Sequence, residues 1–225
     1  MTNLVQFPGL GLSFELDRVA FSIGGMNIYW YGVCIAVGMC LALVFAFRHS
    51  VEFGVDADAM VDVILIGVVM GILCARLYYV ALSPYQYHSL KDVLAIRDGG
   101  LAIYGGIIGA FLFGGLACKW RKVPVLPMFD LAAMGFLIGQ ACGRWGNFFN
   151  QEAFGANTKL PWGMISNTTM EYISNHYDEL GGKVSALDPI HPCFLYESIW
   201  CLIGFIILHF YLKHRKFDGE VFLMY

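Results

Sequence analysis

The residues between Gly143 and Gly155 carry side chains that could bind and transform an anionic substrate. This stretch reads GRWGNFFNQEAFG and follows an apolar run that ends at Cys142. Its guanidinium, side-chain amides and carboxylate come, in chain order, from Arg144, Asn147, Asn150, Gln151 and Glu152. Strong hydrogen-bonding groups therefore lie where a hydrophobic segment meets polar surroundings.

Arg144 has two interpretations at such a position. An ionisable side chain at membrane depth costs roughly 2.5–3.5 kcal/mol to insert, which makes it a functional hypothesis. A guanidinium binds phosphate bidentately and keeps its charge, and the phosphate nearest to this depth is that of a lipid head group. Alternatively, Arg144 only extends from a helix end to the interface and the asparagines cap that helix. The neighbouring amides and carboxylate favour a binding site.

The composition indicates the environment that positions these residues. The chain has 225 residues, of which 58% are hydrophobic and 14% charged, whereas about 25% charged residues is usual in soluble domains. We therefore expect an all-α polytopic membrane protein. A net charge of −3 gives no reason to expect a nucleic-acid partner. The cysteines form no CxxC pair, so we expect neither a disulfide framework nor a metal site.

Hydropathy predicts the transmembrane helices. Each candidate has about the 17–25 residues needed to cross the hydrocarbon core. The predicted spans are 28–47, 59–80, 101–118, 125–142 and 192–212. A sixth hydrophobic run begins at Gly219 and reaches only Tyr225, so we expect the chain to be cut inside a hydrophobic segment.

The basic residues predict the orientation. They concentrate in the short connections 48–58, 119–124 and 213–218, which the positive-inside rule assigns to the cytoplasm. The amino terminus and the long segments 81–100 and 143–191 are then expected on the outer side. Glycines spaced four residues apart within the spans, as at Gly105 and Gly109, predict close packing of helix backbones.

This orientation gives several polar residues one common depth. They are Tyr31, Arg76, Tyr104, Arg144 and Glu197, all near the outer ends of their spans. We therefore predict that two cations and one carboxylate meet at the outer boundary, with tyrosines around them. Taken singly, the tyrosines could be interfacial aromatics, and Arg76 could form a structural ion pair with Glu197.

Four motifs together resemble a known family. WYG at 30–32, DGGLAIYGG at 98–106, GRWGNFFNQEAFG at 143–155 and HPCFLYE at 191–197 are similar, in order and spacing, to bacterial prolipoprotein diacylglyceryl transferases. The resemblance covers essentially the whole chain. It implies an enzyme of the inner membrane that moves the diacylglyceryl group of phosphatidylglycerol onto the lipobox cysteine of a prolipoprotein, the first step of lipoprotein maturation, and releases glycerol phosphate.

The resemblance also implies an architecture and a set of functional positions. The intact protein would have six to seven transmembrane helices in one domain, 1–225 in this chain, with a small periplasmic head formed by residues 153–190. The amino terminus and active site would face the periplasm. The functional positions carry over to Tyr31, Arg144, Asn147, Glu152, Gly155 and Glu197.

This sequence departs from the family pattern at two places. The family often has histidine where this chain has Tyr104, and a phenol is a poorer general base at neutral pH than imidazole. Family members also continue through further hydrophobic segments with another arginine motif.

The transferase hypothesis gives each candidate a role. Arg144, helped by Arg76 or by the arginine of the further family motif, would hold the lipid phosphate, while Asn147 and Tyr31 would hydrogen-bond the head group. The thiol must lose its proton, since the thiolate is the nucleophile. The candidates for assisting this step are His191, Glu152 and Tyr104.

No metal or organic cofactor is required by this scheme. The alternative is a transporter or lipid-binding protein in which the motif is a broken helix that binds an anion. Its signature, two matching interrupted spans, is absent from the sequence.

Overall fold

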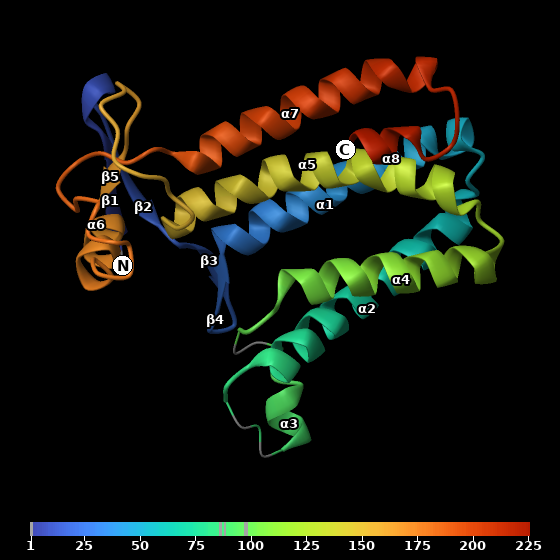
Figure 1. Ribbon diagram of the computed structural model, residues 1–225, viewed down its shortest axis with the longest axis horizontal. Coiled ribbons are helices and arrows are strands. Elements are labelled where there is room, and N and C mark those ends of the chain that lie inside the picture. The colour runs from blue at the N-terminus through green and yellow to red at the C-terminus, as the bar shows by residue number, and fades with distance from the viewer. Residues whose placement is uncertain (1, 86, 88, 97–98) are drawn as a thin grey trace. The chain divides into compact units, whose positions relative to one another are not determined.

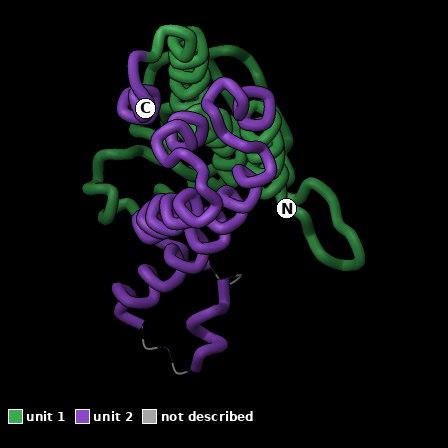
Figure 2. The backbone as a smooth tube through the Cα atoms, turned by 90° about the vertical axis from the view of Figure 1, so that its right-hand side faces the viewer, with its two compact units in different colours: residues 1–45, 133–215, 225 green, residues 46–132, 216–224 purple. Residues whose placement is uncertain are grey.

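The computed structural model describes residues 2–85, 87, 89–96 and 99–225. Arg97 and Asp98, which the sequence analysis assigned to the outer segment and to the 98–106 motif, lie outside the described residues. The chain divides into two compact units (Figure 2). Unit 1 contains residues 1–45, 133–215 and 225, and unit 2 contains residues 46–132 and 216–224.

The five predicted spans are confirmed as helices that are long and apolar enough to cross a membrane. They are α1 (Trp30–His49), α2 (Ala57–Leu82), α4 (Ile103–Arg121), α5 (Val125–Asn150) and α7 (Cys193–Tyr211) (Figure 1). The shorter α-helices are α3 (Leu90–Val93), α6 (Asn167–Asn175) and α8 (Glu220–Met224). The expected class, an all-α polytopic membrane protein, is thus confirmed.

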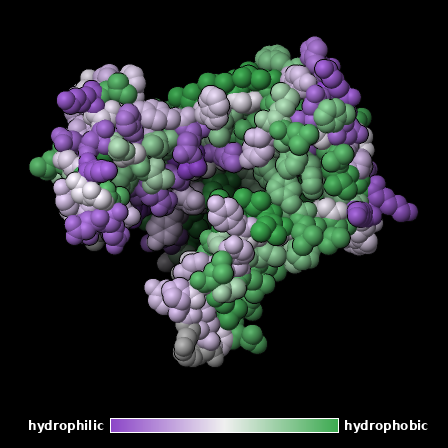
Figure 3. Space-filling model, viewed as in Figure 1, coloured by the Kyte–Doolittle hydropathy of each residue, from purple (hydrophilic) through white to green (hydrophobic). Residues whose placement is uncertain are grey.

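The surface of the long helices is apolar, as a lipid environment requires. Large hydrophobic side chains such as Leu65, Ile108 and Trp200 are exposed on α2, α4 and α7. In Figure 3 hydrophobic residues cover much of the helical surface, and hydrophilic residues gather on the strands and loops of unit 1. Helices that are apolar on their outer faces are typical of membrane spans.

Unit 1 contains short strands that the sequence analysis did not expect. β1 (Thr2–Phe7) pairs antiparallel with β2 (Leu12–Asp17) and with β5 (Ile165–Ser166), giving the strand order β2-β1-β5. β3 (Val19–Ile23) and β4 (Met26–Tyr29) form a separate hairpin. We call β1, β2, β5, α6 and their connecting loops the head, and β3 with β4 the hairpin.

The head has its own hydrophobic core. Alternate residues of β1 are buried, as expected for a strand with one face against a core. The buried cluster consists of Val5, Phe7, Phe148, Met164, Ile173, Ile190 and Phe194. Phe148 belongs to α5 and Phe194 to α7, so the same core attaches the head to the ends of these two helices.

Helices α1, α5 and α7 pack closely within unit 1. A Cβ atom added at Gly38 would lie 3.2 Å from Cα of Gly139, so the backbones of α1 and α5 approach each other there. Ser198 of α7 donates a hydrogen bond of 2.9 Å to the carbonyl of Ala141 on α5, and Trp145 donates to Ser198 Oγ at 3.2 Å. These contacts hold the α5–α7 pair that carries the central motif.

Unit 2 is built around the pair of helices α2 and α4. A Cβ added at Gly105 would lie 2.5 Å from the carbonyl oxygen of Cys74, and one at Gly109 would lie 2.4 Å from Cys74 Cβ. The predicted packing role of these two glycines is therefore confirmed. Elsewhere in unit 2, buried Asp130 accepts hydrogen bonds from the backbone N–H groups of Gly219 and Phe222, and thereby caps the start of α8.

Candidate functional site

The central motif occupies the last turns of α5 and the tight turn that ends it. α5 continues to Asn150, so the expectation that Arg144 follows the outer end of its helix is wrong. The apolar run ends at Cys142, but the helical hydrogen bonds continue through the polar residues. Arg144 and Asn147 therefore take fixed positions on a helix.

The turn after α5 has an unusual backbone. The N–H of Glu152 donates to the carbonyl of Asn147 at 3.1 Å, and the N–H of Gln151 to that of Phe148 at 3.3 Å, the pattern of a Schellman cap. Gln151 takes the left-handed position with φ of 56°, where glycine is usual, and Ala153 has φ of 52°. Non-glycine residues in this region are strained, and such strain clusters at functional sites.

Arg144 forms an ion pair with Glu197. Arg144 Nη2 on α5 contacts Glu197 Oε2 on α7, and both side chains are partly exposed. The structure thereby brings together two residues that the sequence analysis placed at a common depth. The guanidinium has five N–H donors, so one contact to a carboxylate leaves donors that can bind another anion.

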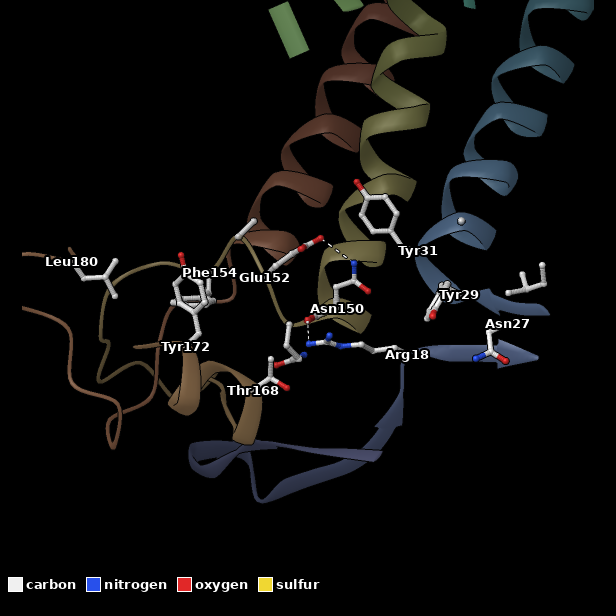
Figure 4. Close-up of a pocket in the computed structure, with 14 residues that line it drawn as sticks. Arg18, Asn27, Tyr29, Tyr31, Asn150, Glu152, Phe154, Thr168, Tyr172 and Leu180 are labelled. Carbon is white, nitrogen blue, oxygen red and sulfur yellow. Dashed lines mark hydrogen bonds between the residues drawn. The ribbon is translucent and has the colours of Figure 1, made fainter. Parts of the chain in front are cut away.

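Next to the end of α5 lies a pocket of about 990 Å³ (Figure 4). Its walls come from the start of α1, the hairpin, the turn after α5, and α6. The lining residues are Arg18, Asn27, Ile28, Tyr29, Tyr31, Gly32, Asn150, Gln151, Glu152, Ala153, Phe154, Thr168, Tyr172 and Leu180. Two predicted site residues, Tyr31 and Glu152, are among them.

Local packing positions the side chains of Tyr31 and Glu152. Glu152 Oε1 accepts a hydrogen bond of 3.1 Å from Asn150 Nδ2. Tyr31 lies against Gly146, where an added Cβ would come within 2.6 Å of the tyrosine ring and 3.2 Å of its Cα. The glycine of the motif therefore allows α1 to approach α5 and places the Tyr31 phenol beside the pocket.

Arg18 is a pocket residue that the sequence analysis missed. It lies between β2 and β3, and its Nη2 donates a hydrogen bond of 3.0 Å to the carbonyl of Asn150. A cation at the carboxyl end of a helix is favourable because the last carbonyls lack helical partners. The sequence does contain a signal for the hairpin that follows Arg18. This signal is Gly24-Gly25, a two-residue turn between short apolar runs.

Gly155 and His191 lie against each other. The N–H of Gly155 donates to the carbonyl of His191 at 3.0 Å, and a Cβ at Gly155 would lie 2.8 Å from His191 Cβ. The His191 ring is held from its other side, because Nδ1 lies 3.0 Å from the hydroxyl of Tyr196, which also accepts a hydrogen bond from Trp162 Nε1 at 2.7 Å. This chain of contacts orients the imidazole.

Arg76, in unit 2, has structural partners. Its guanidinium is buried and donates to the carbonyls of Asp92, Val93, Gly99 and Gly100 at 2.6–3.1 Å. The rings of Tyr79 and Tyr87 lie 5.8 and 5.7 Å from its Cζ. Arg76 of α2 thus holds the backbone at Asp92–Val93 and at Gly99–Gly100 in place.

The remaining candidates have fewer contacts. Tyr104 is the second residue of α4 in unit 2, and its side chain is exposed. Asn147 is half-buried on α5 and uses its carbonyl to cap the turn. Because Arg76 and Tyr104 belong to unit 2, their predicted meeting with Arg144 stays a prediction.

Among the described residues, no group of three or more His, Cys, Asp or Glu side chains could hold a metal ion.

These features define a class of protein. It is a multi-pass membrane protein with an ion-paired arginine near the ends of two long helices, and with a polar and aromatic pocket lined partly by a small head.

Comparison with known proteins identifies the family. Residues 18–225 match the family model for prolipoprotein diacylglyceryl transferase. The phosphatidylglycerol–prolipoprotein diacylglyceryl transferase of Clostridioides difficile (strain 630) is 38% identical over 211 residues, which cover 93% of this chain and 77% of that protein. Proteins of the same name from Clostridium novyi (strain NT) and Bacillus cereus (strain Q1) are both 40% identical, covering 93% and 96% of this chain and 79% and 78% of theirs. The chain belongs to the prolipoprotein diacylglyceryl transferase family.

Proposed function

We propose that this protein transfers the diacylglyceryl group of phosphatidylglycerol to the lipobox cysteine thiol of prolipoproteins. The carbon–oxygen bond between the diacylglyceryl carbon and the phosphate breaks, and a thioether bond forms between that carbon and the cysteine sulfur. Glycerol phosphate leaves with the bonding electron pair, and the thiol proton passes to a base. Family membership is the observation that carries the proposal, and the Arg144–Glu197 pair and the Tyr31–Glu152 pocket support it.

Arg144 is the residue proposed to hold the lipid phosphate. One guanidinium edge contacts Glu197, which fixes its direction, and other N–H groups are available to a phosphate. Charge that develops on the departing glycerol phosphate is then stabilised by a cation already oriented before the reaction. Asn147, three residues further along α5, and Tyr31, across from Gly146, are assigned to the polar head group.

Glu152 is the residue proposed to assist loss of the thiol proton. It lines the same pocket as Tyr31 and is held by Asn150. His191 remains a candidate, although its Nδ1 contacts Tyr196. Tyr104 also remains a candidate for accepting the proton. Arg76 remains a candidate for binding the phosphate, although its guanidinium already donates to four carbonyls. Gly155 supports the site by allowing the close approach of His191.

The proposed location is the bacterial cytoplasmic membrane, with the head and pocket on the outer side. The basic connections support this orientation by the positive-inside rule. Prolipoproteins would reach the pocket from the bilayer that supplies phosphatidylglycerol. The reaction as written uses no cofactor.

The test is transfer by the purified protein in phosphatidylglycerol vesicles. A lipobox peptide should gain the mass of one diacylglyceryl group, and a peptide with Ser in place of the lipobox Cys should gain nothing. Vesicles of phosphatidylcholine alone should give no product. Absence of product with the cysteine peptide would reject the proposal, and uptake of a small anion that Arg144→Ala abolishes would favour a transporter instead.

A further inference from the structure

The hairpin has a free strand edge that faces the pocket. β3 and β4 pair only with each other in the part of the chain that the structure describes. Three consecutive residues of β4, Asn27, Ile28 and Tyr29, all line the pocket. Side chains along a strand alternate between two faces, so three neighbours in a row can line one pocket only if the strand presents its edge to it.

The register of the hairpin identifies the backbone groups at this edge. Ile23 and Met26 flank the two-residue turn, and the next pair is Ser22 with Asn27. Pairs in an antiparallel ladder alternate between hydrogen-bonded and non-hydrogen-bonded, and the pair that closes a two-residue turn is hydrogen-bonded. The N–H and C=O of Asn27 therefore point away from β3. The bond of 2.7 Å from Ser22 Oγ to Asn27 Oδ1 agrees with the closer side chains of a non-hydrogen-bonded pair.

The other walls of the pocket suit a polypeptide better than an anion. Arg18 is the cation of the lining and Glu152 its carboxylate, so the two charges offset each other. Aromatic surface comes from Tyr31, Phe154 and Tyr172. Gln151 is buried in the same wall, and its Oε1 has no hydrogen-bond partner among the described residues. Balanced charge, aromatic surface and an open strand edge match an extended neutral backbone.

The phosphate site proposed above lies elsewhere on the same helix. Arg144 does not belong to the pocket lining. It precedes Asn150 by six residues, which corresponds to about 9 Å along the axis of α5. The two sites adjoin at Tyr31, which lies against Gly146, and elsewhere the lipid phosphate and the pocket occupant contact different residues.

We propose that the free edge of β4 binds the acceptor polypeptide as an added strand. The segment that follows the lipobox cysteine would pair with Asn27–Tyr29, with the cysteine at the Tyr31–Glu152 end. This segment is chosen because a signal sequence is apolar up to its processing site and belongs in the bilayer, whereas the hairpin lies in the chain between the head strand β2 and α1. The inference rests on the proposed transferase function, of which it names the acceptor subsite.

The first test uses backbone-modified peptides with the purified protein. A lipobox peptide with Ser in place of Cys cannot be lipidated, so its binding is measured by fluorescence anisotropy without turnover. N-methylation of single residues after that position removes one backbone N–H at a time. We expect Kd to rise tenfold or more at alternate positions only. Equal effects at neighbouring positions would overturn the proposal, because only strand pairing alternates.

The second test compares two proline variants of the hairpin. Asn27→Pro removes the outward N–H at the pocket edge, and Ser22→Pro removes the matching N–H at the opposite edge. Both lose the Ser22–Asn27 bond, so they perturb the hairpin alike. We expect Asn27→Pro to raise the peptide KM tenfold or more with an unchanged KM for phosphatidylglycerol, and Ser22→Pro to change neither. Equal changes in the peptide KM of the two variants would overturn the proposal. If Asn27→Pro does not fold, the N-methylated peptides provide the test instead.

Two further outcomes distinguish failure of the acceptor subsite from failure of the transferase function. If the cysteine peptide is never lipidated but the Ser peptide binds with alternating sensitivity, the transferase proposal fails and the strand-docking site stands. If glycerol phosphate displaces the peptide from the native protein and not from Arg18→Ala, the pocket binds the lipid head group, and the acceptor proposal is overturned.

Discussion

Arg144 of α5 and Glu197 of α7 form an ion pair that joins two helices carrying different sequence motifs. Ser198, the residue after Glu197, accepts a hydrogen bond from Trp145 and donates one to the carbonyl of Ala141, so the two helices are also hydrogen-bonded next to the ion pair. The guanidinium direction is thus set by several contacts between α5 and α7.

Replacement of Arg144 by lysine is expected to remove most of the activity. Lysine keeps the charge but lacks the planar fork that binds phosphate bidentately and reaches Glu197. Loss of such a contact in the transition state is worth about 3–4 kcal/mol, on the order of a hundredfold or more in rate. Diacylglyceryl transfer to a lipobox peptide is the measurement.

Arg121→Lys provides the control for this variant. Arg121 also pairs with a carboxylate, Asp62, at 2.8 Å and with similar exposure, but this pair belongs to unit 2 and to none of the four sequence motifs. It should retain native activity. Near-native turnover of Arg144→Lys would mean that Arg144 only anchors the helix end.

Gly146→Ala is expected to damage both stability and activity. The new Cβ would lie 2.6 Å from the Tyr31 ring and 3.2 Å from its Cα, so α1 must shift and the phenol must move. Overpacking of this kind costs about 1–3 kcal/mol. The melting temperature in detergent and the transfer rate are measured together.

Gly143→Ala is the matched control, since it lies one turn earlier in the same helix. A Cβ at Gly143 would meet no atom within 4 Å, and alanine is the better helix former. Its melting temperature should stay unchanged or rise. Equal destabilisation by both variants would contradict the close contact of Tyr31 with Gly146.

Arg76→Lys separates a structural role from the predicted phosphate role. Lysine cannot reproduce the donor geometry that reaches Asp92, Val93, Gly99 and Gly100. Hydrogen bonds from a charged donor are worth about 1.5–3 kcal/mol each, so the melting temperature should fall clearly. The KM for phosphatidylglycerol should stay the same in the fraction that remains folded. An increase in this KM without loss of stability would instead support the phosphate role.

Glu152→Gln is expected to change the pH dependence of transfer. A free thiol with a pKa of about 8.5 is mostly protonated at neutral pH and needs a base there, but ionises by itself above that value. The variant should therefore lose on the order of tenfold in rate at pH 7 and recover part of the loss near pH 9. The pH–rate profile is compared with that of Glu179→Gln, an exposed head carboxylate outside the pocket lining. A profile unchanged from the native one would assign the proton to another residue, and His191→Gln is tested next.

The sequence by itself determined the five membrane helices and the chemical character of the central motif. Hydropathy is a local property, because each lipid-facing helix satisfies its own backbone hydrogen bonds and needs only enough apolar residues in a row. The cluster of Arg144 with amides and Glu152 is likewise visible because its members are close in the chain.

Only the tertiary structure decided which distant residues meet. Arg18 reaches Asn150 across 132 residues because β1 and β2 fold onto β5, and these strands are too short to stand out in a hydropathy pattern. The sequence alone is equally compatible with a phosphate as the only partner of Arg144 and with a carboxylate as the partner of Arg76. Helix packing gave Arg144 the carboxylate of Glu197, and the loop after α2 gave Arg76 its carbonyls. A side chain's type sets what it can bind, but its partner depends on contacts formed only when the chain is packed.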